Sequence, residues 1–217
     1  DNLLTQPVAR FTTSAMTVTE GDSGQRTITF QVTLDRPSVT GTSVSVMVVG
    51  GTATNGTDFA LADSVADFAA GQSTATVTLT VFGDTGFEAN ETVNLRLTGP
   101  NGLDIDTSAD DLSLTILNDD AKVTVTGTPG NDVRFATADA EIFDLGGGRS
   151  DLVSYVNSTS GVTADLINGG SGGFADQDEY IGVERITGSN YDDFLYGDDG
   201  NNRLLGEDGD DHLYGRG

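Results

Sequence analysis

The residues best suited to bind a metal ion stand in a nine-residue repeat near the C-terminus. Each repeat opens with a glycine and carries an aspartate or asparagine at its sixth position. The opening glycines are Gly188, Gly197 and Gly206, the fourth-position glycines are Gly200 and Gly209, and the sixth residues are Asp193, Asn202 and Asp211. Glycine permits tight turns that aim carbonyl oxygens inward, and calcium is a hard cation that takes about six to eight oxygen ligands. The repeat therefore predicts calcium sites built from glycine carbonyls and the sixth side chain.

An apolar residue at the eighth position of each repeat indicates a folded segment, because a flexible linker keeps no such register. These residues are Leu195, Leu204 and Leu213. A three-residue strand turns each leucine into a narrow core, and two repeats form one coil, so that residues 18 apart stack on the same side. On this basis Asp193 and Asp211 share one site, and Asn202 forms a weaker pair with Glu184.

The pattern continues upstream in a degraded form. The segments 127–135, 136–144 and 146–154 each keep an acid in register, and these acids are Asp132, Glu141 and Asp151. A Gly-rich insertion, INGGSGGFADQD (167–178), interrupts the repeat. The whole arrangement resembles the RTX region, with its hemolysin-type calcium-binding repeats, of large bacterial proteins exported by type I secretion. The resemblance implies a parallel β-roll over residues 121–217 that binds several Ca²⁺ ions.

The N-terminal part consists of short predicted strands at regular spacing. The candidates are Phe11–Val18, Thr27–Asp35, Ser43–Val49, Ser64–Phe68, Ala75–Phe82, Thr92–Leu97 and Leu112–Leu117. The runs ITFQVTL (28–34), SVSVMVV (43–49) and TATVTLTV (74–81) alternate with a period of two, as half-buried strands do. The chain is therefore predicted to be all-β, with an immunoglobulin-like antiparallel β-sandwich over residues 1–120 followed by the β-roll.

Acidic residues in this sandwich fall at the ends of the predicted strands, where loops from distant parts of the chain meet. They are Glu20, Asp58, Asp84, Glu88, Asp119 and Asp120. The segment resembles a Calx-beta domain over residues 8–120, in the blocks VTEGDSG (18–24), GTATNGTDF (51–59), FAAGQSTATVTLTV (68–81), FEANETVNLRL (87–97) and LTILNDD (114–120). The resemblance implies that these six acids are calcium ligands. Gly83 and Asn118 stand where the strongest calcium binders of the family carry further acids, which implies fewer ions or weaker affinity.

Composition limits the partners of the chain. The 217 residues include 34 acids against 10 Lys and Arg, for a net charge of −24. A field this negative repels nucleic acid and anionic membranes and favours cations. Cysteine is absent, which excludes disulfides and thiolate chemistry. No apolar run is long enough to span a membrane, and no signal peptide opens the sequence. Because the last repeat is cut off, the chain is expected to be a piece of a longer protein.

Catalysis is not expected, because the residue types that it needs are scarce. The chain has one histidine, His212, at an outward strand position. The clustered acids already have an explanation as calcium ligands, so the chain is interpreted as not being an enzyme. The leading hypothesis is a calcium-binding structural module, folded and stiffened by extracellular calcium, in a secreted or cell-surface adhesin or stalk. The alternative is a calcium-dependent secretion and folding region attached to a secreted enzyme or toxin. Neighbouring domains, or a surface glycan or protein, remain further candidate partners.

Overall fold

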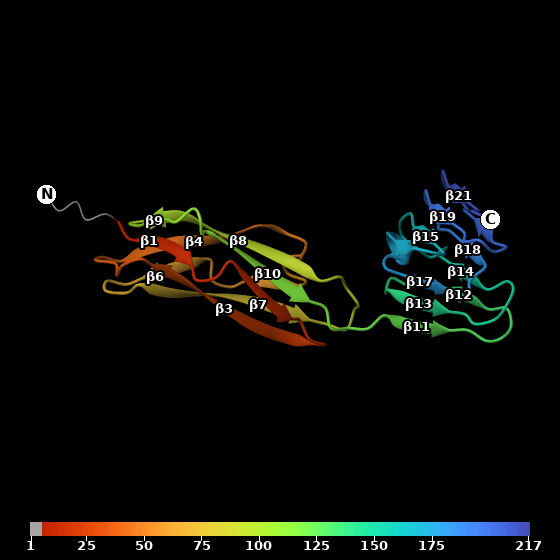
Figure 1. The fold of residues 1–217 in the computed structure, drawn as a ribbon, viewed down its shortest axis with the longest axis horizontal. Helices are drawn as coiled ribbons and strands as arrows, with labels where there is room; N and C mark the ends of the chain where they lie inside the picture. Colours follow the sequence, from red (N-terminus) through yellow and green to blue (C-terminus); the bar gives the residue numbers. More distant parts are fainter. Residues whose placement is uncertain (1–5) are drawn as a thin grey trace. The chain divides into compact units, whose positions relative to one another are not determined.

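The computed structural model describes residues 6–217 (Figure 1). The chain divides into two compact units, of which the first ends at Asp120 and the second spans Ala121–Gly217. Strands make up the regular structure of both units, apart from one short 3₁₀ helix, η1 (Gly173–Ala175). The all-β prediction is confirmed. Within residues 6–217 the structure contains no helix with the length and apolar character needed to cross a membrane.

The first unit is a sandwich of two five-stranded sheets. One sheet has the order β5 (Phe59–Leu61), β7 (Thr74–Gly83), β3 (Gly24–Leu34), β1 (Val8–Phe11) and β9 (Asp104–Ile105). The other has the order β2 (Ala15–Thr19), β10 (Asp111–Leu117), β8 (Glu91–Asn101), β4 (Thr42–Gly51) and β6 (Val65–Phe68). Neighbouring strands are antiparallel, except that β1 pairs with β9 and β2 with β10 in parallel. The sandwich prediction is therefore confirmed, with two parallel pairs added.

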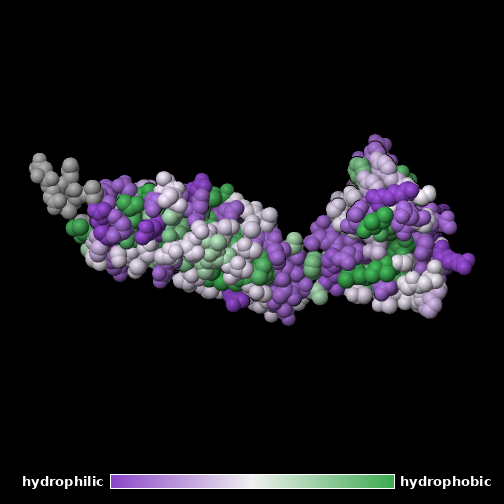
Figure 2. Space-filling view, viewed as in Figure 1, coloured by the Kyte–Doolittle hydropathy of each residue, from purple (hydrophilic) through white to green (hydrophobic). Residues whose placement is uncertain are grey.

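Alternating apolar residues fill the space between the two sheets. Along β3 the side chains of Phe30, Val32 and Leu34 are buried while the residues between them are not. Successive residues of a strand point to opposite faces of the sheet, so this alternation places one face in the core. Phe30 packs edge-to-face against Phe11, with ring centroids 6.2 Å apart. Figure 2 shows the outer surface, where hydrophobic residues form patches among hydrophilic ones.

The predicted strand Phe11–Val18 is wrong as a single element. The structure divides it into β1 and β2, which lie in opposite sheets. The break falls at Thr12–Ser14, where the hydroxyl of Thr13 donates to the carbonyl of Ala15 at 2.9 Å. Threonine hydroxyls that bond to the nearby backbone compete with the sheet ladder, and this local bond accompanies the crossing of the chain from one sheet to the other.

The second unit is built of short strands in register. One sheet has the order β11 (Val123–Thr126), β13 (Glu141–Asp144) and β17 (Glu179–Ile181). A second has the order β12 (Val133–Phe135), β14 (Leu152–Ser154), β18 (Arg185–Thr187) and β20 (Arg203–Leu205). A third has the order β16 (Gly169–Ser171), β15 (Thr163–Asp165), β19 (Phe194–Tyr196) and β21 (His212–Tyr214). All pairs are parallel except β15 with β16, which confirms the parallel β-roll.

The expected 18-residue stacking is present in the ladders. Leu195 pairs with Leu213 and Ile186 with Leu204. Leu195 is fully buried, Leu204 is half-buried, and Leu213 is 47% exposed. The leucine register therefore builds the core as predicted, and burial decreases along the last coils.

A buried polar cluster lies within the second unit. The hydroxyl of Tyr155 donates to Asp178 at 2.7 Å and lies 2.5 Å from the hydroxyl of Tyr180. The other carboxylate oxygen of Asp178 accepts from the backbone N–H of Glu141 at 2.8 Å. Burial is the main cause that raises the pKa of Asp178 to about 7. The ring of Tyr180 stacks on that of Phe143, so this polar cluster is continuous with the apolar core.

Candidate calcium sites

Acidic side chains gather at one end of the sandwich because the strands that carry them end there. Glu20 follows β2, Asp58 precedes β5 and Asp84 follows β7. Glu88 lies in the loop between β7 and β8, and the remaining two predicted acids, Asp119 and Asp120, follow β10. Loops at one end of a sandwich bring distant segments together, and the electrostatic interactions described below join all six.

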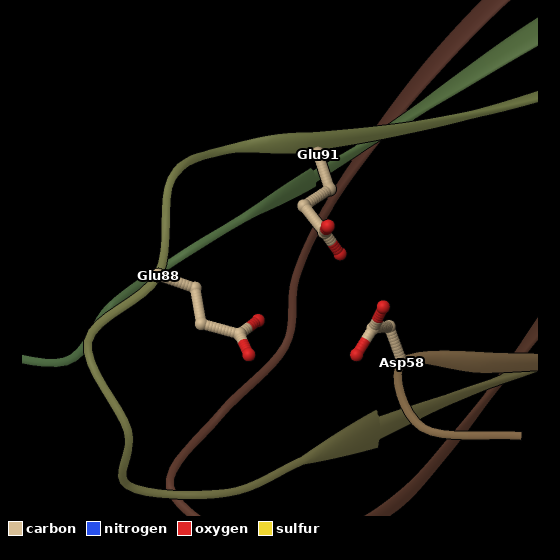
Figure 3. A group of neighbouring side chains, drawn as sticks. All are labelled: Asp58, Glu88 and Glu91. Atoms are coloured by element: carbon tan, nitrogen blue, oxygen red, sulfur yellow. The ribbon is translucent and has the colours of Figure 1, made fainter. Parts of the chain in front are cut away.

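Two of these carboxylates, Asp58 and Glu88, form a compact group with a third, Glu91 (Figure 3). One carboxylate oxygen from each of Asp58, Glu88 and Glu91 lies within 4.8 Å of the others. The Oδ2 atom of Asp58 accepts from the backbone N–H of Thr54 at 2.5 Å, which fixes the orientation of the side chain. Three oxygens at this separation suit one hard cation, whereas three bare negative charges repel one another.

Glu20 extends the group into the interior. Its side chain is 8% exposed, and its Oε1 atom is buried and has no hydrogen-bond partner among the described residues. Burial, together with the smaller effect of the negative charges of Glu88, Asp84, Asp120 and Asp119, raises its pKa to about 7. A buried carboxylate without a donor is costly unless a cation or a proton neutralises it.

Asp119 and Asp120 complete the cluster. Asp119 accepts from the backbone N–H of Gly21 at 2.9 Å, which ties the end of β10 to the turn after β2. The Oδ2 atom of Asp120 is buried without a partner in the part of the chain that the structure describes. Desolvation raises the pKa of Asp120, and Asp119, Asp22 and Asp84 add to the shift. The structure therefore brings all six predicted acids together.

Glu91 is the residue that sequence reasoning missed. It is the first residue of β8, three positions after Glu88 and within the same FEANET segment. Its pKa is raised to about 7. Burial is the largest cause, and a side-chain hydrogen bond with Asp58 and charge repulsion from Asp58 also contribute. Its closeness in sequence to Glu88 was the available signal, but Glu91, which directly precedes the predicted strand Thr92–Leu97, was not among the acids assigned as ligands.

The glycine at position 83 has a steric explanation. A Cβ atom built on Gly83 would overlap the backbone carbonyl of Gly21 and lie 2.9 Å from that of Glu20. An acid at this position would therefore require a different backbone path. Gly83 therefore stands in place of an acid because the end of β7 passes close to the turn between β2 and β3.

In the roll, the sixth side chain of each repeat accepts backbone hydrogen bonds, within its own turn for Asp193 and Asn202 and from the adjacent coil for Asp211. Asp193 accepts from the backbone N–H of Ser189 at 2.6 Å and from that of Val162 at 2.8 Å, and it is fully buried. Asn202 accepts from the N–H of Asp198 at 2.8 Å. Asp211 accepts from the backbone N–H of Asp193 at 3.0 Å. That last bond joins residues 18 apart and places the two predicted partners in adjacent coils.

The opening glycines are needed because the sixth side chain lies against them. A Cβ atom at Gly188 would overlap Asp193, and one at Gly206 would overlap Asp211. The third opening glycine, Gly197, has the same relation to its own sixth residue, Asn202. The fourth-position glycines differ from each other. Gly209 has φ +129° and a Cβ position 2.6 Å from the backbone of Tyr191, whereas at Gly200 the nearest atom would be Asp198 Oδ1 at 3.0 Å.

The irregular coils repeat this arrangement with different spacing. Asp132 accepts from the N–H of Thr128 at 2.7 Å, and Asp151 accepts from the N–H of Asp132 at 2.6 Å. Asp151 is fully buried, and its second oxygen has no partner among the described residues. Glu184 accepts in turn from the N–H of Asp151 at 3.0 Å. These acids form one column along the roll, so the structure places Asp132 and Asp151 next to each other.

Glu141 belongs to another column. It accepts from the N–H of Thr137 at 2.9 Å and its own N–H donates to Asp178. Burial raises the pKa of Glu141. Asp178 was not predicted, because it lies in the Gly-rich insertion where the nine-residue period gives no register.

The donor set of both units fits calcium. The clustered side chains offer carboxylate oxygens, and in Glu20, Asp120 and Asp151 one of these oxygens is buried without a hydrogen-bond donor. Hard oxygen donors are the ligands that Ca²⁺ takes. The fold and the sites thus define a calcium-binding protein made of two all-β modules.

Comparison with known families agrees with this class. The chain belongs to the Calx-beta domain family, whose model matches residues 5–127. The model of the RTX calcium-binding nonapeptide repeat, in 4 copies, matches residues 181–217. Both families are calcium-binding and non-catalytic, so calcium is the cofactor to expect in both modules. RTX repeats are typical of secreted proteins.

Solved structures similar to the chain include calcium-binding domains. The apo form of the Calx CBD1 domain is 26% identical, with a TM-score of 0.47, and the match covers 53% of this chain and 99% of that one. The CBD12 structure from CALX1.2 is 25% identical, with a TM-score of 0.47, and the match covers 60% of this chain and 52% of that one. No curated protein matches the sequence.

Proposed function

We propose that the chain is a calcium-binding structural module of a large secreted or cell-surface bacterial protein. The observation that carries the proposal is the convergence of seven acids on one end of the sandwich, with buried oxygens that lack donors. Calcium that binds only the folded form stabilises it by mass action. The module is then weakly folded where calcium is scarce and rigid where it is abundant.

We assign the ligands as two groups. In the sandwich they are Glu20, Asp58, Asp84, Glu88, Glu91, Asp119 and Asp120. In the roll they are the acids and amide of the turns with neighbouring glycine carbonyls, namely Asp132, Glu141, Asp151, Asp193, Asn202, Asp211, Gly188, Gly197, Gly200, Gly206 and Gly209. Isothermal titration with calcium tests the first group. The variant Glu91→Gln is expected to lose affinity at the sandwich, whereas Asp104→Asn, which removes the same charge from an exposed strand, is expected to bind as the wild type does.

The role we propose for the module is that of a segment in an adhesin or surface stalk. The assignment of the clustered acids as calcium ligands supports this role. A segment that transmits force needs stiffness, and ions that join several loops of one module provide it. Single-molecule stretching tests this role: the unfolding force of each unit is expected to rise when calcium replaces EGTA. Equal forces in the two buffers would contradict it.

The second candidate is a secretion and folding region attached to a secreted enzyme or toxin, and the RTX repeats favour it. The parent protein distinguishes the two. A tandem array of similar sandwiches supports the stalk, and an adjoining catalytic domain supports the carrier.

A further inference from the structure

The basic residues of the second unit fall into two groups. Three of them form ion pairs: Lys122 with Glu179 at 2.6 Å, Arg134 with Asp132 at 3.2 Å and Arg216 with Asp165 at 2.5 Å. The other three are Arg149, Arg185 and Arg203, and none of the ion pairs among residues 6–217 includes them. In a chain with 34 acids and 10 basic residues, arginines without an acid partner are unexpected.

The three unpaired arginines lie near one another. Arg185 in β18 and Arg203 in β20 are direct partners across a parallel ladder, and neighbouring strands are about 4.8 Å apart. The next residue of β18, Ile186, points into the core and is 1% exposed, so Arg185 and Arg203 stand on the outer face of the sheet. Arg185 Nη1 donates to the hydroxyl of Ser150 at 3.4 Å, and Arg149 precedes that serine.

Arg185 also has an unsatisfied donor. Its Nε atom is buried and has no hydrogen-bond partner among the described residues. The neighbouring carboxylate of Glu184 does not hydrogen-bond to this atom and accepts instead from the backbone N–H of Asp151 at 3.0 Å. Two like charges on facing residues of neighbouring strands repel each other, and a buried donor without an acceptor costs free energy. An anion placed between the two guanidinium groups offsets their repulsion and supplies the acceptor oxygens that the Arg185 side chain lacks.

We propose that Arg185 and Arg203, together with Ser150, bind an oxyanion, which is a carboxylate or sulfate group. The planar guanidinium fork matches two oxygens of such a group, and the serine hydroxyl adds a third donor. The group is either a free inorganic ion or part of an acidic saccharide. The net charge of −24 opposes the approach of any anion, so binding is expected to strengthen when calcium neutralises part of the acidic charge.

The direct test is an NMR titration of the whole chain, ¹⁵N-labelled and saturated with calcium. The Nε–Hε signals of the arginines are followed while sodium sulfate is added in one series and a sulfated disaccharide in the other. The signals of Arg185 and Arg203 are expected to shift and saturate, while that of Arg216, which is held by Asp165, stays in place. Saturation with both probes identifies a site that accepts a saccharide, and saturation with sulfate alone identifies a site for the free ion. No saturable shift with either probe would overturn the proposal.

Variants separate a specific site from diffuse attraction. Arg203→Gln, at an exposed position, is expected to weaken binding about tenfold, as the loss of one charge-assisted bidentate contact does. Arg185→Gln is expected to have a similar effect, and Arg185→Lys a smaller one, because lysine keeps the charge but loses the fork. The control Arg10→Gln removes the same charge from the exposed side of β1 in the sandwich and is expected to bind as the wild type does.

An equal loss in the Arg10→Gln control would mean that net charge and not a site attracts the anion, and this would also overturn the proposal. Calcium titration of each variant by calorimetry provides the independent reference. Unchanged calcium binding in Arg203→Gln with weaker sulfate binding separates the oxyanion site from the calcium sites. Sulfate binding that persists unchanged in both glutamine variants would show that these arginines do not form the site.

Discussion

The side chain at the sixth position of each repeat and the glycine that opens the repeat occupy adjoining space. A Cβ atom at Gly206 would overlap the carboxylate of Asp211, whereas one at Gly215 would have no atom within 4 Å. Gly206→Ala is therefore expected to destabilise the roll by about 1 to 3 kcal/mol, as overpacking does, and to reduce calcium binding. Gly215→Ala is the matched control and is expected to change neither. Thermal melts in calcium check both variants, and equal melting temperatures would contradict the steric argument.

Proton competition is expected at the sandwich cluster. The pKa values of Glu20 and Glu91 are raised to about 7, first by burial and then by neighbouring acids. The calcium-free folded state therefore holds more protons than the unfolded chain between pH 4.5 and about 7. Without calcium, stability falls as pH rises through this window. Urea melts of the calcium-free chain near pH 5 and pH 8 check this, with the greater stability expected near pH 5.

Calcium reverses the direction of this dependence, because the ion and the protons compete for the same oxygens. Calcium affinity at the sandwich is expected to increase as pH rises from about 5 to about 8. In Glu20→Gln, which lacks one of the titrating groups, the dependence is expected to be shallower. A calcium affinity that is independent of pH in the wild type would show that these carboxyl groups are not the ligands.

At the scale of single residues, the sequence was enough to predict which six acids of the sandwich lie close together. The six sandwich acids converge because the loops and strand ends that carry them meet at one end of the sandwich. Glu91 was missed because the predicted strand begins only at Thr92, whereas the structure extends β8 back to Glu91 and places its carboxylate beside those of Asp58 and Glu88. Asp178 was missed because its burial depends on Tyr155 and Tyr180, which the nine-residue period does not place.

At the scale of elements, the 18-residue period makes Asp193 and Asp211 act together. The backbone N–H of Asp193 donates to Asp211 across adjacent coils. Asp193→Ala and Asp211→Ala are expected to disable the same ion site, so the double variant loses about as much calcium as either single variant. Calorimetric stoichiometry checks this. Independent, additive losses would show that the two residues serve separate ions.

Strand positions could be predicted where apolar and polar residues alternate over a long run. They could not be predicted for strands of two or three residues or for strands rich in glycine. The ladder of β3 and β7 joins ten residue pairs, and the predicted strands Thr27–Asp35 and Ala75–Phe82 cover most of it. The short strands β5 and β9, with three and two residues, carry too few positions to show a period. The hairpin of β15 and β16 was not predicted either, because its glycines have no side chains to alternate.

At the scale of the whole molecule, the two units depend on calcium to different degrees. The core of the sandwich is larger than that of the roll, and the inward residue of the last coil, Leu213, remains 47% exposed. Apolar burial is the main favourable contribution to folding, so the roll relies more on its ions. Addition of EGTA is expected to melt the roll first while the sandwich keeps most of its β signal in far-ultraviolet circular dichroism. An identical spectrum with and without chelator would contradict this.

The buried cluster of Tyr155, Asp178 and Tyr180 gives this experiment an intrinsic spectroscopic probe. The chain has no tryptophan, and all 5 of its tyrosines lie after residue 121. Near-ultraviolet dichroism and tyrosine fluorescence therefore report on the roll alone, and the sandwich contributes only phenylalanine bands. The hydroxyls of Tyr155 and Tyr180 are hydrogen-bonded to each other, and Tyr155 also bonds to Asp178. The near-ultraviolet dichroism of these two rings is therefore expected to disappear when the roll unfolds. The unlabelled chain can thus show the melting of the roll by its tyrosine signals, while far-ultraviolet dichroism follows the β structure of the sandwich.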